Sequence, residues 1–156
     1  MSTVLYKRAT FATQLPVAHL YSHSHNWLRR SPEAPESEVW QVGYTKFALR
    51  MLGELVDVQF EATPGTTIQP GDVLGSIEGF KAVSDLYSIG QGTFVRANPA
   101  LNGSLESLVQ KPYDTGWMYE FRGKPDDRIL DLDGYRALLD ATIDRMLEKQ
   151  QQHEQP

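Results

Sequence analysis

The chain has 156 residues, a formal net charge of -5 at pH 7 and no cysteine. This length is typical of one domain, and the lack of cysteine excludes a disulfide framework, cysteine-ligated zinc and a cysteine nucleophile. The acidic balance argues against nucleic-acid binding, and no segment is long and apolar enough to span a membrane. We therefore expect one cytoplasmic domain whose partners include neither nucleic acid nor a membrane.

The N-terminal half predicts short strands and one short helix. Residues 1–26 show no sustained period, so we expect an arm or edge segment there, with an N-terminal arm over residues 1–19. Thr45 to Gly53 combines a capping residue, helix formers and a final glycine, which predicts a helix. Runs bounded by turn residues predict strands at 27–29, 38–43, 55–60 and 73–78.

The C-terminal half continues this pattern of short strands as far as residue 121. Strands are predicted at 93–96 and 117–121, with a loop at 98–103 and a helical turn at 104–109 between them. Short strands with a turn about every ten residues are typical of a small sandwich or barrel, so the fold class predicted is mainly β with short helices.

Residues 132–149 predict an amphipathic helix, with a linker before it from residue 123. Its apolar face is expected to contain Tyr135, Leu138, Leu139, Thr142 and Met146. Such a helix covers an apolar patch of its own domain or, alternatively, docks or dimerises with a partner. The glutamine-rich residues 150–156 are expected to be disordered.

The most informative segment surrounds Lys81. Residues 75–88 read Gly-Ser-Ile-Glu-Gly-Phe-Lys-Ala-Val-Ser-Asp-Leu-Tyr-Ser. This segment resembles the lipoylation hairpin of glycine cleavage system H proteins, which reads roughly Glu-Ser-Val-Lys-Ala-x-Ser-Asp. The resemblance extends in order over residues 20–122, with further matching motifs at 24–29, 42–45, 52–56, 92–101 and 112–118.

The resemblance implies a barrel-sandwich hybrid fold of the lipoyl-domain type and a covalent lipoate on Lys81. An amide-linked lipoyl-lysine arm is about 10–15 Å long, so it must project from a turn to enter a partner's cleft. The residues expected to form the hairpin and to be recognised by a lipoate-attaching enzyme are Glu78, Gly79, Phe80, Ala82, Ser84 and Asp85. The structural alternative is that Lys81 is an ordinary solvated lysine.

The same resemblance implies a non-catalytic carrier. Its arm would carry an aminomethyl group between glycine decarboxylase, aminomethyltransferase and dihydrolipoyl dehydrogenase. The arm cleft expected by resemblance contains Asn26, Phe47 and Asp85, yet the family has glutamate where this chain has Asn26 and histidine where it has Phe47. Without that carboxylate and imidazole, the cleft suits a less cationic cargo.

These residues leave two other functions open. The departures at Asn26 and Phe47 either reflect ordinary drift or mark a lipoate-binding paralogue that passes sulfur intermediates to a heterodisulfide-reductase-like complex. The third function is that of an interaction protein that keeps the fold without lipoate. His19 and His23 would share a helical face, but no third ligand supports a metal site. A biotin carrier would need methionine on both sides of Lys81.

Overall fold

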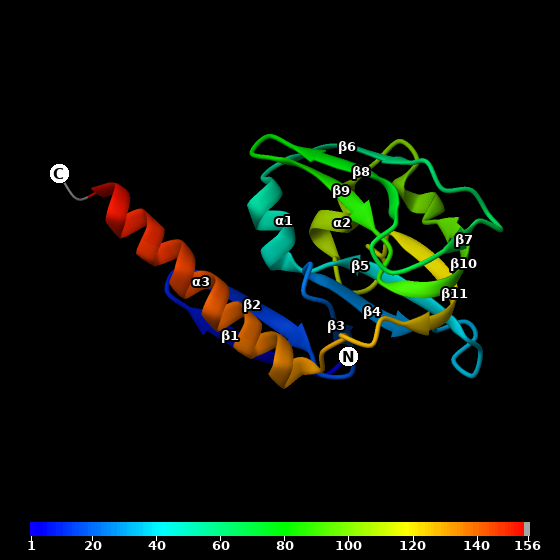
Figure 1. The fold of residues 1–156 in the computed structure, drawn as a ribbon, viewed down its shortest axis with the longest axis horizontal. Coiled ribbons are helices and arrows are strands. Elements are labelled where there is room, and N and C mark those ends of the chain that lie inside the picture. Colours follow the sequence, from blue (N-terminus) through cyan, green and yellow to red (C-terminus); the bar gives the residue numbers. More distant parts are fainter. Residues whose placement is uncertain (155–156) are drawn as a thin grey trace.

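The computed structural model describes residues 1–154 and is built from three sheets and three α-helices (Figure 1). A six-stranded sheet has the order β3-β4-β5-β11-β10-β7, and a three-stranded sheet has the order β6-β8-β9. The strands are β1 (Thr3–Arg8), β2 (Phe11–Pro16), β3 (Leu20–Tyr21), β4 (Asn26–Arg30), β5 (Val39–Tyr44), β6 (Leu55–Phe60), β7 (Thr67–Ile68), β8 (Val73–Gly79), β9 (Val83–Tyr87), β10 (Gly90–Ala97) and β11 (Tyr119–Pro125). The helices are α1 (Lys46–Leu52), α2 (Glu106–Gln110) and α3 (Leu132–Glu154), with a 3-10 turn at Pro99–Leu101.

Inward-facing side chains of the two larger sheets form the main core. The buried members include Val42, Ile68, Leu74, Ile77 and Phe94. Because alternate residues of a strand point to opposite faces, short strands with one buried face produce the alternation read from the sequence. The prediction of a mainly β fold with short helices is confirmed, and no helix of residues 1–154 is long and apolar enough to cross a membrane.

Helix α1 lies where the sequence predicts it. The Thr45 Oγ1 accepts a hydrogen bond from the Ala48 N–H at 3.4 Å, and Gly53 ends the helix with φ of +77°. Glycine suits this left-handed conformation because it has no Cβ. Phe47 and Leu52 are the buried residues of the helix, and Leu52 packs into the main core whereas Phe47 packs into a second core.

The N-terminal segment is a hairpin, so the prediction of an irregular arm over residues 1–19 is wrong. Strands β1 and β2 pair in antiparallel register around a turn at Ala9 and Thr10. Phe11, Thr13 and Leu15 are buried alternately along β2. This period-two pattern spans too few residues to stand out from the polar sequence around it. The hairpin joins a second core that includes Trp27, Phe47 and Tyr135.

The C-terminal helix covers this hairpin (Figure 1). Tyr135, Leu139 and Ile143 are buried, whereas the predicted face member Met146 is 41% exposed. A narrow contact with the hairpin uses one residue per helical turn, which explains why the wider predicted stripe is only partly buried. Helix and hairpin are also joined by polar contacts: the Tyr6 hydroxyl donates to Asp140 at 2.7 Å, and the Arg8 guanidinium donates two hydrogen bonds to Asp144.

Two predicted boundaries need correction. Helix α3 runs to Glu154, so residues 150–154 are helical rather than disordered, and residues 155–156 lie outside the described part. Glutamine is a good helix former, which allows the last turns to continue without a packed face. Strand β11 extends to Pro125, three residues beyond the predicted end of the carrier domain, because it pairs with β10 as far as Gly90.

A buried hydrogen-bond network joins α3 to the start of α1. The Tyr135 hydroxyl lies 2.7 Å from Thr45 Oγ1 and 3.0 Å from Nδ1 of His25. Burial lowers the pKa of His25 to about 4, so its ring is neutral near pH 7. The Tyr135 hydroxyl has a single proton, so it donates to one of Thr45 Oγ1 and His25 Nδ1 and accepts from the other.

This network predicts an acid-sensitive fold. His25 has a depressed pKa of about 4 in the folded chain and an ordinary pKa of about 6.5 when unfolded. The unfolded state therefore binds the extra proton as the pH falls between these values, and folding loses about 2–3 kcal/mol from pH 7 to pH 4. Urea unfolding at both pH values checks this loss. His25→Asn is the control, since asparagine tolerates the φ of +64° at this position and does not titrate. Equal acid destabilisation of both proteins would contradict the prediction.

Candidate functional site

Lys81 occupies the tip of the hairpin formed by β8 and β9. These strands pair antiparallel, with Glu78 opposite Val83, and the Gly79 N–H closes the turn by donating to the Ala82 carbonyl at 2.9 Å. The side chains at the tip project into solvent, and that of Phe80 is 76% exposed. The predicted presentation of a lysine on an exposed turn therefore matches the geometry of residues 79–82.

The C-terminal end of α1 holds the tip in place. The Lys81 N–H donates to the Leu52 carbonyl and the Phe80 N–H donates to the Glu54 carbonyl, both at 2.9 Å. Gly53 lies under the lysine stem, because a Cβ there would be 2.9 Å from the Lys81 Cγ. Two backbone hydrogen bonds thus fix the peptide at Lys81 while its side chain extends across Gly53.

The residues expected to be read by a lipoate-attaching enzyme surround this tip. Glu78 and Asp85 are both exposed. They lie on the same, outer face of the hairpin, because Glu78 pairs with Val83 and Val83 lies two residues before Asp85. Ala82 is also exposed, whereas Ser84 is half-buried and its hydroxyl donates to the Asp85 carbonyl at 3.0 Å. The structure brings this predicted set together around Lys81.

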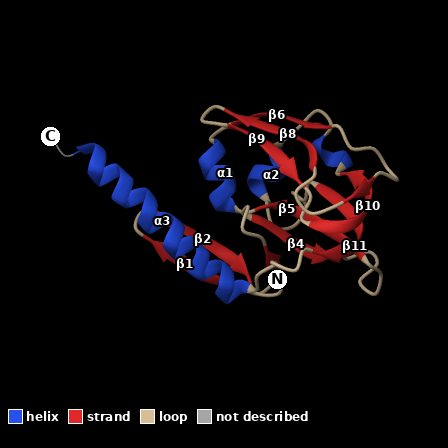
Figure 2. Ribbon diagram, in the orientation of Figure 1, coloured by secondary structure: helices blue, strands red, loops and turns tan. Residues whose placement is uncertain are grey.

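A groove of about 750 Å³ begins beside the lysine stem. It lies between α1, α2 and the N-terminal hairpin, and Figure 2 shows the two short helices next to the three-stranded sheet. Its lining includes Phe11, Leu49, Arg50, Gly53, Leu105 and Val109. Sequence reasoning missed this groove, although Lys46, Leu49, Arg50 and Gly53 have the i, i+3, i+4, i+7 spacing of one helix face.

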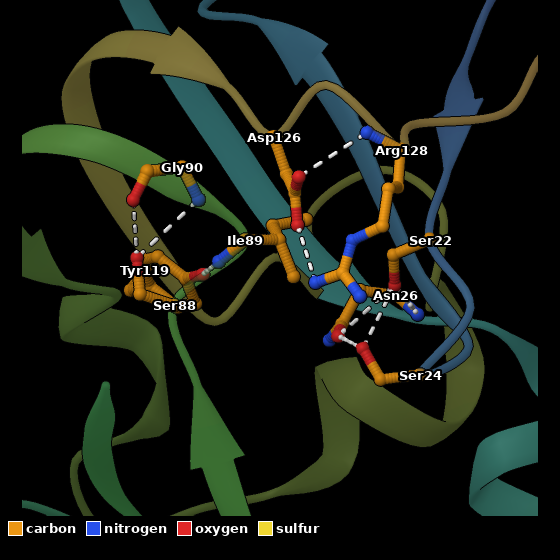
Figure 3. Close-up of polar contacts among 9 residues, drawn as sticks. All are labelled: Ser22, Ser24, Asn26, Ser88, Ile89, Gly90, Tyr119, Asp126 and Arg128. Atoms are coloured by element: carbon orange, nitrogen blue, oxygen red, sulfur yellow. Dashed lines mark hydrogen bonds and ion pairs between the residues drawn. The ribbon is translucent and has the colours of Figure 1, made fainter. Parts of the chain in front are cut away.

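The three residues predicted to form an arm cleft lie on three different elements, β4, α1 and β9. Asn26 is buried, and its side chain accepts from Ser24 at 2.8 Å and from Ser22 at 3.4 Å, as Figure 3 shows. Phe47 is buried edge-on against the Phe11 ring, with ring centroids 5.5 Å apart. Asp85 lies on the outer hairpin face. The groove beside Lys81 contains none of these three residues.

The histidines near the N-terminus have structural roles in this fold. His19 is buried next to Trp27, and its Nε2 lies 2.9 Å from the Tyr113 carbonyl oxygen. Burial lowers its pKa. Residues 19–23 form no helix, and within residues 1–154 no group of three histidine, aspartate or glutamate side chains is placed to hold a metal ion.

Comparison with known proteins identifies the family. A family model described as glycine cleavage H-protein matches residues 19–141. The chain belongs to this family. Glycine cleavage system H protein from Bacteroides fragilis is 36% identical over 124 residues, which cover 78% of this chain and 94% of that protein. The H protein from Corynebacterium jeikeium is 33% identical over 80% of this chain and 97% of its own length.

A solved H-protein structure supports the same assignment. The crystal structure of the protein from Mycobacterium marinum is 30% identical, covers 79% of this chain and 97% of its own length, and superposes with a TM-score of 0.69. The predicted barrel-sandwich fold is thereby confirmed. Strands β1 and β2 lie outside the residues matched to the H-protein family, as does the part of α3 after residue 141.

Proposed function

We propose that Lys81 carries lipoate in amide linkage and that the chain is a lipoyl carrier without catalytic activity of its own. One observation carries this proposal: an exposed lysine sits on a turn whose backbone is fixed by α1, and its stem lies over Gly53, which lines a groove. A fixed base and a long flexible arm are what a carrier needs to reach several active sites.

The partners proposed from family membership are a lipoate-attaching enzyme and the glycine cleavage enzymes. The attaching enzyme would read the exposed carboxylates Glu78 and Asp85 near the tip. Glycine decarboxylase, aminomethyltransferase and dihydrolipoyl dehydrogenase would then exchange an aminomethyl group with the arm and reoxidise it.

Intact mass tests the lipoylation of Lys81, and reconstitution tests the glycine cleavage cargo. After co-expression with a lipoate-attaching enzyme, the chain should gain one lipoyl group, located on Lys81 by peptide mapping. Addition of the lipoylated chain to glycine decarboxylase should then support release of carbon dioxide from glycine. A lipoylated chain that does not support this release would retain the carrier role and exclude the glycine cargo.

A second candidate is a carrier of a different cargo, such as sulfur passed to a heterodisulfide-reductase-like complex. The observation that favours it is the environment of the groove, where Lys46 and Arg50 lie along α1. An aminomethyl group is protonated near pH 7 and gains nothing from these cations. Transfer of sulfur from the lipoylated chain to such a complex is the matching assay.

A further inference from the structure

We propose that the groove ends in a subsite for an anionic group carried on the tip of the arm. This inference rests on the proposed lipoylation of Lys81 and assigns the chemical class of the cargo. The subsite is formed by Lys46 and Lys111, together with the side of the N-terminal hairpin that contains Thr13.

The groove runs in the right direction and for the right length. A second hollow of about 380 Å³ shares Lys46 and Val109 with the groove, so the two lie next to each other at the N-terminal end of α1. Seven residues separate Gly53 from Lys46, which corresponds to about 10 Å of helix. An arm about 10–15 Å long that starts over Gly53 therefore reaches this far end with its sulfur atoms.

The polar groups at the far end favour a negative charge. Lys46 and Lys111 form no ion pair with any of residues 1–154, whereas the nearby Asp114 carboxylate is bound to Arg29 at 3.0 Å. The Thr13 hydroxyl is buried against Tyr113 and closed to solvent, so Thr13 contributes to the wall of the hollow rather than a donor for a ligand. Two lysine ammonium groups without an acidic partner in the described part of the chain suit an anion better than an amine.

The acidic residues of the groove lie elsewhere or are already hydrogen-bonded. Glu54 is next to Gly53, at the end where the lysine stem enters. The carboxylate of Glu106 accepts from the Gln110 side chain at 2.7 Å. Arg50 lies between the two ends with its guanidinium 5.5 Å from the centre of the Phe11 ring. The charge along the groove thus becomes more positive away from Lys81.

The N-terminal hairpin makes this subsite a feature of the present chain. Phe11, Ala12 and Thr13 of β2 form one side of the groove and its far end, and they lie outside the residues matched to the family. The hairpin is fixed by its contacts with α3, so this wall does not depend on a bound partner. A fixed cationic end allows the carrier to discriminate among cargoes by charge.

Alkylation of the arm tests the charge preference directly. The chain has no cysteine, so the two thiols of the reduced lipoyl arm are the only thiols available. Iodoacetate, iodoacetamide and 2-bromoethylamine each form a carbon–sulfur bond with loss of halide and the thiol proton. They leave the arm negative, neutral and positive, respectively. The readout is the amide chemical-shift change at Thr13, Lys46 and Lys111 relative to the unlipoylated chain.

We expect the carboxymethylated arm to shift these amides at least threefold more than the aminoethylated arm. The double variant Lys46→Gln and Lys111→Gln should remove this difference, while Lys124→Gln, far from the groove on β11, should preserve it. Equal or larger shifts with the aminoethylated arm would overturn the cargo inference and leave the carrier function intact. Failure of the chain to take up lipoate, detected by intact mass before alkylation, would overturn both.

Discussion

Replacement of Lys81 by arginine is expected to abolish lipoylation of the chain completely while leaving it folded. Lipoate attaches through an amide to the lysine amine, and the delocalised, permanently protonated guanidinium of arginine does not provide that nucleophile. Lys81 is exposed, and its backbone N–H, rather than its side chain, bonds to Leu52. The free energy of unfolding should therefore change by no more than about 0.5 kcal/mol.

The control is Lys124→Arg, which changes an exposed lysine on β11 in the same way. Both variants are co-expressed with a lipoate-attaching enzyme and weighed intact, and urea unfolding shows whether each is folded. The expected result is one lipoyl group on Lys124→Arg and none on Lys81→Arg. Lipoyl mass on the Lys81→Arg variant would place the modification at another lysine.

The hairpin and helix α1 could be predicted from sequence because their signals are local. Thr45 and Gly53 mark the ends of α1 by capping chemistry, and the glycines and charged residues around Lys81 define a turn. The contacts that make these elements into a site are not local. Nothing in the spacing of residues 45–53 and 78–85 reveals that the Leu52 carbonyl accepts from Lys81.

The N-terminal hairpin was harder to predict from sequence, because the contacts that fix it are also not local. Its apolar and polar residues are interspersed, and the decisive contacts of Tyr6 and Arg8 are with Asp140 and Asp144, more than 130 positions away. These contacts place the hairpin along one side of the groove, whereas the arm cleft of Asn26, Phe47 and Asp85 was predicted from the family resemblance and stays a prediction. Asn26 and Phe47 differ from the family pattern, but their side chains pack inside the protein instead of facing that groove.

Substitution of Gly79 by alanine should disrupt the hairpin tip even though its backbone conformation suits any residue. Gly79 is absent from the positions with positive φ, so a close contact alone decides the effect. A Cβ at this position would lie 2.1 Å from the Leu52 carbonyl oxygen. The hairpin or α1 must then move, and the hydrogen bonds from Phe80 and Lys81 to α1 and the residues after it are lost.

Overpacking against backbone costs about 1–3 kcal/mol, and two broken hydrogen bonds add about 1–3 kcal/mol, so we expect a total loss of about 2–6 kcal/mol. Lipoylation should slow by more than tenfold because the lysine loses its fixed position. Urea unfolding and timed intact-mass measurements check the two effects. Val83→Thr is the matched control, since Val83 directly follows the same turn, is 67% exposed and is not among the residues expected to be recognised by the attaching enzyme. If Gly79→Ala is lipoylated as fast as this control, support from α1 is not what makes Lys81 a substrate, and the sequence around the lysine alone would be sufficient.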